Sequence, residues 1–478
     1  MPLDSDSCYR ALLAHDPRFD GKFFVGVSST RIYCRPVCTV RAPRRENCHF
    51  FRSAAAAEGE GYRPCLRCRP ELAPGNAGVD ATARIARVAV DLIEDGALDD
   101  GDLESLAARV GVTSRHLRRV FDTQFGVSPI AYAQTHRLLL AKHLLTDTAL
   151  PVTEVALASG FASLRRFNAL FKARYRMAPS RLRADANARA SPAGLVFGLA
   201  FRPPYDWAAM LDFLRARAID GVEDVSRDAY RRTLAVERRG TVHNGWVEVR
   251  RAPRKAALAV GVSASLARAV PAVLARVKHA FDLDCDPERV ATVLGDLAKD
   301  APGLRVPGTF DGFELAVRAV VGQQVTVRGA RTLLGRIAAA FGAPVGDSHP
   351  AGLSLLFPAA ARLAACSEGE VAQLGITRTR SRTLIALARA VAAGELTLAP
   401  GADVDATMAR LSALPGIGPW TAQYIAMRAL GWPDAFPADD LGIRKAMGET
   451  RPAQALARSE TWRPWRAYAV IHLWRKVA

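Results

Sequence analysis

The stretch LPGIGPWTAQY, residues 414–424, decides the fold of the C-terminal half of this 478-residue chain. Apolar residues recur at helical spacing on both sides of Gly416 and Gly418, which predicts two helices joined by a tight turn. Closely spaced glycines leave backbone N–H groups uncovered at the start of the second helix, and such groups suit a DNA phosphate. Gly-Ile-Gly alone fits an ordinary helix–helix turn equally well, so its interpretation depends on the surrounding residues.

A pair of acids follows this hairpin. In AFPADDLGIRK (435–445), Asp439 and Asp440 come directly after a proline and an alanine. The acid pair and the hairpin aromatics Trp420 and Tyr424 are candidates for a functional site. Core packing is the alternative role of each aromatic side chain.

Upstream of the hairpin the period of the sequence changes. RTLAVERRGTVHNGWVEVRRAPRKAALAVGVS (232–263) has short β-branched runs broken by Arg-Gly, Asn-Gly and Pro, which predicts antiparallel strands. Two breaks, PELAPGNAG (70–78) and RADANARASPAG (183–194), read as linkers. We therefore predict four segments, with bounds 1–74, 80–185, 195–290 and 291–478.

The segment 80–185 contains two similar helical hairpins, DLESLAARVGVTSRHLRRVF (102–121) and PVTEVALASGFASLRRFNALFKARY (151–175). Gly111 and Gly160 supply the turns, and Ser114 is expected to cap the second helix of the first hairpin. The apolar faces of the hairpins carry Leu103, Leu106, Ala107, Val110, Leu117, Val120 and Phe121, then Val152, Val155, Ala156, Leu164, Phe167, Leu170 and Phe171. The opposite faces of the second helices carry Arg115, His116, Arg118, Arg119, Arg165, Arg166 and Asn168. Such basic helices suit the major groove of DNA, although ordinary hairpins with solvated faces remain the alternative.

Five of the eight cysteines lie between residues 34 and 68. YCRPVC (33–38) and CLRC (65–68) offer four thiolates at a spacing typical of a tetrahedral zinc site. A reducing compartment favours metal binding or thiol chemistry over disulfides for such a cluster. Spacing alone does not distinguish a purely structural zinc site from one with a reactive thiolate.

Charge and composition indicate the kind of partner. The formal net charge is +18 and half of the residues are apolar. This charge is spread along the chain and favours a polyanion such as nucleic acid, with solubility or a high-GC genome as the alternatives. No apolar run approaches the ~20 residues that span a bilayer, and the first residues lack the layout of a signal peptide. We expect a cytoplasmic, nucleoid-associated bacterial protein with no membrane partner, and a monomer.

The C-terminal half resembles the 3-methyladenine DNA glycosylase II (AlkA) family of the helix-hairpin-helix superfamily. Besides the hairpin and the acids, the resemblance rests on FRPPYDWAAMLDFLRARAIDGVE (201–223), APGLRVPGTFDGFELAVRAVVGQQVTV (301–327) and WRPWRAYAVIHLW (462–474). It implies that Asp440 is the catalytic carboxylate, with Asp439 the fallback if the register differs by one. It also implies an aromatic pocket of Trp420, Tyr424, Trp474 and Phe213, and DNA contacts from Gly416, Gly418 and Thr421. Hairpin carbonyls that hold a monovalent cation are a further feature of such relatives.

Two positions depart from the family pattern. Leu441 replaces an aromatic residue, which predicts a roomier or altered pocket. Gln324, in VGQQVTV, takes the place of an apolar wedge that fills the gap left by a flipped base. Enzymes of this superfamily that also nick the strand carry a hairpin Lys, and Trp420 stands at that position here. A monofunctional glycosylase that leaves an abasic site is therefore expected.

The N-terminal part resembles the Ada family of methylation-response proteins through GVSSTRIYCRPVCTVRAPRRENCHFF (26–51) and GYRPCLRCRPE (61–71). The resemblance implies one Zn²⁺ held by Cys34, Cys38, Cys65 and Cys68, with Cys34 accepting a methyl group from a DNA methylphosphotriester. Arg41 and Arg45 are candidates for phosphate contacts. The paired hairpins resemble the AraC-type DNA-binding domain. No Pro-Cys-His-Arg tetrapeptide occurs, so repair of O6-methylguanine is not expected.

The sequence thus predicts a multidomain fold that is mainly α with α+β parts. Its order is a small zinc-bound α/β domain, an all-α double helix-turn-helix domain, a strand-rich α+β domain and a helical helix-hairpin-helix glycosylase domain. The function it predicts is repair of alkylated bases joined to sensing of phosphate methylation, with double-stranded DNA and, after methylation, RNA polymerase as partners. The alternative is a transcriptional regulator whose glycosylase half only binds DNA.

Overall fold

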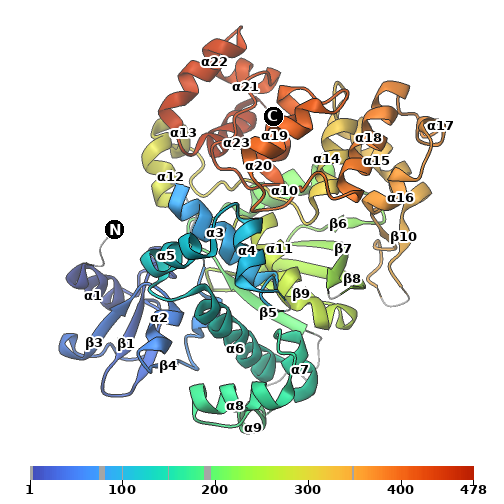
Figure 1. Cartoon of the computed structure of the whole chain (residues 1–478). Coiled ribbons are helices and arrows are strands. Elements are labelled where there is room, and N and C mark those ends of the chain that lie inside the picture. Colours follow the sequence, from blue (N-terminus) through green and yellow to red (C-terminus); the bar gives the residue numbers. More distant parts are fainter. Residues whose placement is uncertain are drawn as a thin grey trace.

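The computed structural model places the chain in four packed regions that follow one another along the sequence (Figure 1). The first and third regions contain sheets of four and five strands, whereas the second and fourth are helical apart from one short hairpin. The predicted fold class, mainly α with α+β parts, is confirmed. The described residues are 4–74, 81–99, 101–148, 150–187, 195–238, 240–346 and 349–477.

A small sheet of strand order β3-β1-β2-β4 forms the centre of the N-terminal region. Strand β1 is antiparallel to β2 and β3, while β4 runs parallel to β2. Strand β2 ends at Cys34 and β4 ends just before Cys65, so their pairing brings the two halves of the cysteine set together. The elements are α1 (Ser5–Leu13), β1 (Phe24–Val27), β2 (Ile32–Cys34), β3 (Cys48–Phe51), α2 (Ala54–Gly59) and β4 (Arg63–Pro64).

Helices are the regular structure of the second region in residues 81–99, 101–148 and 150–187, and the predicted helical hairpins are confirmed. Leu117, Phe121, Phe167 and Phe171 are buried, as their spacing predicts. The predicted cap is wrong by one residue: Thr113 caps its helix, and its hydroxyl accepts from the N–H of His116 at 3.2 Å. The elements are α3 (Ala81–Glu94), α4 (Leu103–Arg109), α5 (Ser114–Phe125), α6 (Pro129–Asp147), α7 (Val152–Ala158), α8 (Leu164–Tyr175) and α9 (Pro179–Asn187). The helical pattern predicts that Leu164 is buried, and this is wrong because Leu164 is 41% exposed. It is the first residue of α8, and the helix enters the core only in its next turn.

The third region is an antiparallel sheet of strand order β5-β9-β8-β7-β6, which confirms the predicted strands. The Asn-Gly pair is not a turn, however, because Asn244 and Gly245 lie inside β8. A Cβ on Gly245 would lie 2.2 Å from Ser263 Oγ, so glycine is needed there for close packing. The elements are β5 (Leu195–Ala200), α10 (Trp207–Arg217), β6 (Glu223–Val225), β7 (Ala229–Arg238), β8 (Thr241–Arg251), β9 (Ala257–Val262) and α11 (Val270–Ala280).

The fourth region surrounds the predicted hairpin, which is the turn between α19 and α20. Its elements are α12 (Pro287–Leu294), α13 (Asp296–Lys299), α14 (Gly312–Val321), α15 (Val327–Phe341), β10 (Ala343–Pro344), β11 (Leu355–Leu356), α16 (Ala360–Ala364), α17 (Glu368–Ala372), α18 (Arg378–Ala392), α19 (Val404–Ala413), α20 (Pro419–Arg428), α21 (Leu441–Met447), α22 (Pro452–Ser459) and α23 (Arg466–Val477). Short 3₁₀ helices across the chain are η1 (Pro17–Phe19), η2 (Arg45–Asn47), η3 (Pro70–Leu72), η4 (Ala264–Ala269) and η5 (Glu460–Trp462). The β10–β11 hairpin was not predicted, since two-residue strands leave no periodic signal.

The regions are packed against one another. One hydrophobic core joins Leu144 and Phe171 of the helical second region to Phe197 and Val247 of the five-stranded sheet. Ion pairs cross other boundaries: Lys278 of α11 contacts Glu94 of α3 at 2.6 Å, and Lys22 contacts Asp286 at 2.7 Å. The second helical hairpin is therefore built onto the sheet. Among the described helices, none has both the length and the apolar character that crossing a bilayer requires.

Candidate active site and metal centre

A cavity of about 450 Å³ opens between the two hydrophobic cores of the fourth region and the edge of the third. Helix α20 contributes Trp420, Tyr424 and Arg428, and α10 contributes Phe213 and Arg217. Asp440, at the N-cap of α21, and Trp474, on α23, also line the cavity. The hairpin spacing thus brings together four aromatic residues and one acid, all of them predicted site residues.

Asp440 is held by three hydrogen bonds. Its Oδ2 accepts from Trp420 Nε1 at 2.8 Å, and its Oδ1 accepts from Trp474 Nε1 at 3.1 Å. Oδ1 also accepts from the backbone N–H of Ile443 at 2.9 Å, because Asp440 caps α21. The N-cap position and the two indole donors fix the orientation of this carboxylate. Asp439 is exposed and lines no part of the cavity, so of the two acids it is Asp440 that the fold directs into the pocket.

The aromatic side chains form a continuous wall around this carboxylate. Trp420 and Tyr424 are stacked, with ring centroids 5.3 Å apart and planes 14° from parallel. Trp474 lies 6.2 Å from Tyr424 at a tilt of 45°. All three are partly exposed and line the cavity, although the ring of Tyr424 is stacked on Trp420 and has the guanidinium of Arg428 5.4 Å from its centroid.

Phe213 lines the cavity as the predicted fourth aromatic residue, but two arginines lie against its ring. The guanidinium carbons of Arg217 and Arg428 lie 3.8 and 4.9 Å from its ring centroid. Arg428 also donates to the hydroxyl of Tyr424 at 2.5 Å. Burial alone would raise the pKa of Tyr424, but Arg428 and Arg217 outweigh it and lower that pKa. Sequence analysis missed both arginines, because an Arg at helical spacing carries no signal that separates a pocket residue from a surface one.

The hairpin turn is tied to the end of α14 by a residue that sequence analysis also missed. Gln323 Nε2 donates to Gly416 O at 3.0 Å and to Thr421 Oγ1 at 2.9 Å. Thr421 is buried and its hydroxyl accepts from Gln323, so the predicted DNA contact does not involve a free side chain. The carbonyl of Gly416 in the hairpin also accepts from Gln323.

We expect Gln323→Ala to weaken binding of duplex DNA about three- to tenfold, because two hydrogen bonds that fix the hairpin are lost. The rate of base release from bound DNA should change little, since Asp440 and its partners are untouched. Titration of an abasic-site duplex and single-turnover kinetics separate the two effects. Gln373→Ala, at an exposed position, is the matched control. An unchanged affinity in Gln323→Ala would contradict a role of this side chain in DNA binding.

The two departures from the family pattern lie outside the cavity. Leu441 is 73% exposed and does not line the pocket, because it starts α21 directly beyond the Asp440 cap. The expectation of a roomier or altered pocket stays a prediction, because Leu441 itself does not reach the cavity. Gln324 is exposed as well, with a φ of +53°, in the loop beyond α14. Left-handed backbone is uncommon for Gln and is typical of functional loops, which is compatible with the predicted wedge.

The four predicted metal ligands converge in the N-terminal region. The sulfur atoms of Cys34, Cys38, Cys65 and Cys68 all lie within 4.8 Å of one another. Tetrahedral Zn²⁺ with Zn–S bonds of ~2.3 Å places sulfurs ~3.8 Å apart, so the set fits this ion. The N–H of Arg35 donates to Cys68 Sγ at 3.4 Å, and that of Arg67 donates to Cys65 Sγ at 3.4 Å. Such N–H groups stabilise thiolates, and the site is a zinc site.

Exposure does not single out the predicted methyl acceptor. Cys34 is 5% exposed, whereas Cys68 is the most accessible of the four cysteines. Arg41 is exposed beside this site, as a phosphate contact requires. Arg45 is already engaged: it pairs with Asp6 at 3.3 Å and lies over the ring of Phe50 at 5.4 Å.

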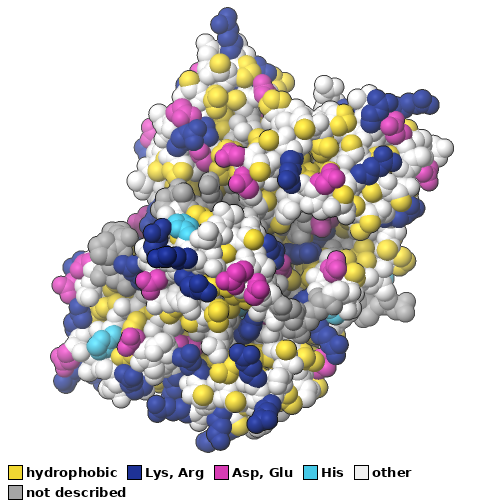
Figure 2. Space-filling model, viewed as in Figure 1, with side chains coloured by type: hydrophobic (Ala, Val, Ile, Leu, Met, Phe, Trp, Pro, Cys, Tyr) yellow, Lys and Arg dark blue, Asp and Glu magenta, His cyan; other side chains and the backbone are white. Residues whose placement is uncertain are grey.

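The predicted recognition helices present their arginines to solvent. The exposed residues are Arg115, Arg118 and Arg119 on α5 and Arg165, Arg166 and Asn168 on α8. Lys and Arg side chains are numerous over the lower part of the face in Figure 2, where the first two regions lie. This placement agrees with the basic faces expected from the sequence.

The fold and these sites define a class: a helix-hairpin-helix base-excision protein carrying a zinc-thiolate module and paired helix-turn-helix units. Four family profiles match consecutive parts of the chain: "Metal binding domain of Ada" (7–71), "Helix-turn-helix domain" (106–185), "AlkA N-terminal domain" (196–311) and "HhH-GPD superfamily base excision DNA repair protein" (317–466).

Similar proteins support the same assignment. A Mycobacterium tuberculosis protein, named a probable bifunctional transcriptional activator/DNA repair enzyme AlkA, is 41% identical over 99% of this chain and 97% of its own. DNA-3-methyladenine glycosylase 2 of Escherichia coli is 40% identical over 58% of this chain and 96% of its own. The chain belongs to the AlkA family, in the form fused to an Ada-type metal-binding domain and a helix-turn-helix domain. A 3-methyladenine DNA-glycosylase structure from Archaeoglobus fulgidus shares the fold, with a TM-score of 0.51 at 20% identity over 58% of this chain and 97% of its own.

Proposed function

We propose that this chain repairs alkylated DNA by hydrolysing the N-glycosidic bond of bases such as 3-methyladenine. The observation that carries the proposal is Asp440, held by two indole N–H groups at a cavity walled by Trp420, Tyr424 and Trp474. The names of the relatives from M. tuberculosis and E. coli agree with this activity.

The aromatic residues and Asp440 have different roles in the proposed reaction. The damaged nucleotide is flipped out of the duplex, and its base stacks against the aromatic wall. An alkylated purine is cationic, so π faces attract it and it leaves without extensive protonation. As the C–N bond breaks, positive charge develops on the deoxyribose, and the carboxylate of Asp440 stabilises that charge and orients the attacking water. Water adds to C1′ and releases a proton through the carboxylate of Asp440 to solvent, the cationic base takes the bonding electron pair and leaves neutral, and an abasic site remains.

The proposed glycosylase should not nick the DNA strand. Trp420 occupies the hairpin position at which a Lys would be needed to form a Schiff base with the sugar. Alkylated duplex incubated with the protein should therefore yield strand breaks only after hot alkali. Borohydride added during the reaction should trap no protein–DNA adduct. Alkali-labile sites without direct breaks are the expected product; an inert wild-type protein would favour the alternative of a regulator that only binds DNA.

A second activity is favoured by the four clustered sulfurs. We propose that Cys34 accepts the methyl group of a DNA methylphosphotriester. The Cys34 sulfur forms a bond to the methyl carbon, the C–O bond breaks, and the phosphate regains its negative charge as a diester. Bound zinc would keep the thiol deprotonated at neutral pH. We propose that Arg41, which is exposed, contacts the phosphate and that Arg45 contributes less because it is already paired with Asp6.

The methylated protein is further proposed to act as a transcriptional activator. Helices α5 and α8 would enter neighbouring major-groove segments of promoter DNA, with Gly416 and Gly418 contacting the backbone of the damaged duplex. We also propose that the methylated protein binds RNA polymerase, that it is a monomer and that it acts in the cytoplasm at the nucleoid. The proposed domain bounds are 1–74, 80–185, 195–290 and 291–478. One hydrophobic core joins α8 to the five-stranded sheet, so the second and third regions pack together across the proposed boundary.

A further inference from the structure

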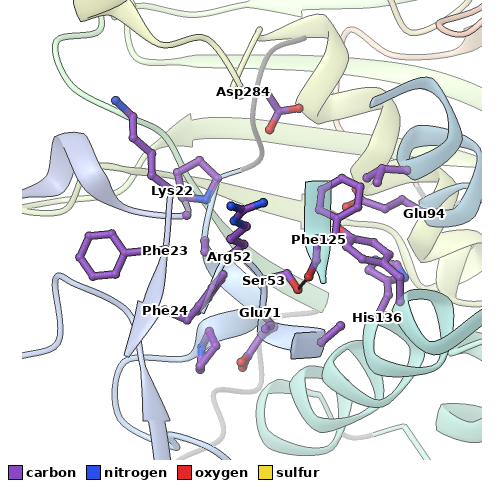
Figure 3. Close-up of a pocket in the computed structure, with 18 of the residues that line it drawn as sticks. Lys22, Phe23, Phe24, Arg52, Ser53, Glu71, Glu94, Phe125, His136 and Asp284 are labelled. Carbon is purple, nitrogen blue, oxygen red and sulfur yellow. Dashed lines mark hydrogen bonds between the residues drawn. The ribbon is translucent and has the colours of Figure 1, made fainter. Parts of the chain in front are cut away.

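The C-terminal ends of both proposed recognition helices meet at one short helix of the zinc-binding region, α2. At the end of α5, Arg52 donates to the carbonyl of Thr123 and Ser53 donates to that of Phe125, both at 2.6 Å. Figure 3 shows Ser53 beside Phe125 at this contact. Carbonyls in the last turn of a helix lack partners within it, so these two bonds fix the end of α5 to residues that lead into α2.

Glu58, on the same short helix, reaches the other two helices. Its Oε2 accepts from Thr135 Oγ1 of α6 at 3.2 Å. Arg174 of α8 forms an ion pair with Oε2, with Nε 3.4 Å away, and also donates to the Glu58 carbonyl. Glu58 is 1% exposed, and a buried carboxylate without partners would be costly. The arrangement therefore holds α6 and α8 at fixed positions relative to α2.

The same contact is connected to the zinc site. The hydroxyl of Tyr33, a residue with no exposed surface that directly precedes Cys34, donates to Glu58 Oε1 at 3.0 Å. A second contact runs from α6, where Lys142 donates to the carbonyl of Cys65 at 3.3 Å and pairs with Glu71 at 2.8 Å. The zinc-binding region thus touches α6 at two buried points, and α6 is the helix that connects the two helix-turn-helix units.

We propose that α2 is a clamp that fixes the separation of the two recognition helices, with Glu58 as its positioning residue. The zinc-binding region is then part of the DNA-reading unit even before methylation. Helix α6, about 28 Å long, packs into the cores of both units, and α2 adds polar contacts that join the ends of α5 and α8 to it. A protein with two rigidly spaced helices accepts only DNA half-sites at one matching separation. This inference rests on the proposed role of α5 and α8 in reading DNA.

The test uses the full-length, zinc-loaded, unmethylated protein and a pool of random-sequence duplexes. Sequences selected by the wild type define two half-sites, and duplexes with one base pair inserted or removed between them then measure spacing preference. We expect the wild type to discriminate against the altered spacing by at least about tenfold. Glu58→Ala should reduce that discrimination to about twofold or less, because α6 and α8 lose their common anchor, while affinity for a single half-site persists.

Further variants separate positioning from general destabilisation. Glu60→Ala, at a neighbouring exposed position, should keep the wild-type preference. Glu58→Gln, which keeps one of the two acceptor oxygens but not the charge, should retain part of it. Thr135→Val removes one contact from the opposite side and should weaken the preference in the same direction, which covers the case that Glu58→Ala does not fold. A folded Glu58→Ala or Thr135→Val protein with full spacing preference would overturn the clamp and leave the proposed activator intact. A wild type that selects no sequence would overturn both.

Discussion

Asp440→Asn will reduce the release of 3-methyladenine from alkylated duplex DNA by about a thousandfold or more. The developing positive charge on the sugar then faces a neutral amide instead of a carboxylate, while the pocket keeps its shape. Single-turnover measurement of base release, with the protein in excess over damaged sites, reports this chemical step directly. Asp439→Asn should retain nearly the wild-type rate because Asp439 is exposed outside the cavity. The reverse ranking of the two variants would assign the reaction to Asp439.

The same substitution has a predictable structural cost. Three N–H donors, from Trp420, Trp474 and the backbone of Ile443, converge on the two oxygens of Asp440. An Asn side chain has one acceptor, so its amide must face one of these donors unpaired, at a cost on the order of 1–3 kcal/mol. Thermal denaturation should show a lower midpoint but one cooperative transition. Retained binding of an abasic-site duplex would show that lost activity is chemical and not the result of unfolding.

Local patterns in the sequence predicted most of the fold. Helical spacing placed Leu117 and Phe167 in the core. The local pattern located the hairpin and the acid pair after it, and the family resemblance selected Asp440 and Trp420. These signals lie within one or two neighbouring elements, where the chain geometry leaves few alternatives. The family resemblance supplied the rest of the aromatic wall, including Trp474 from the far end of the chain.

Contacts between distant segments could not be predicted in the same way. Arg217 and Arg428 meet on the ring of Phe213 although 211 residues separate the two arginines in the sequence. Glu58 likewise contacts Thr135 and Arg174, which lie far from it in the sequence. Neither Arg nor Glu has a periodic signal that distinguishes a buried partner from a solvated surface residue. The predicted turn at Asn244–Gly245 is wrong for a different reason. Here the local turn signal is strong, but close packing of the sheet against Ser263 overrides it.

Cys34→Ser will abolish methyl transfer from a DNA methylphosphotriester, while Cys68→Ser will retain it at a reduced rate. A serine hydroxyl is not ionised at neutral pH and is a far weaker nucleophile than a thiolate. The comparison is sharp because both variants remove one sulfur from the zinc site and so disturb metal binding similarly. It also decides a question that exposure leaves open, because Cys68 is more accessible than Cys34. Fragmentation mass spectrometry of wild-type protein should locate the added methyl group on Cys34, and its location on Cys68 would move the acceptor role to that residue.

Loss of methyl transfer should also remove a change in DNA affinity. Four thiolates around Zn²⁺ carry a net charge near −2, which repels DNA phosphates, and methylation of one sulfur halves that charge. Affinity of the wild type for duplex DNA should then rise after methylation on the order of tenfold at low ionic strength. The rise should shrink as salt is added, because the site lies close to solvent and the charge is screened. Cys34→Ser exposed to the same methylated DNA should show no rise at any salt concentration. A rise in that variant would mean that the affinity change originates elsewhere than in the charge of the zinc site.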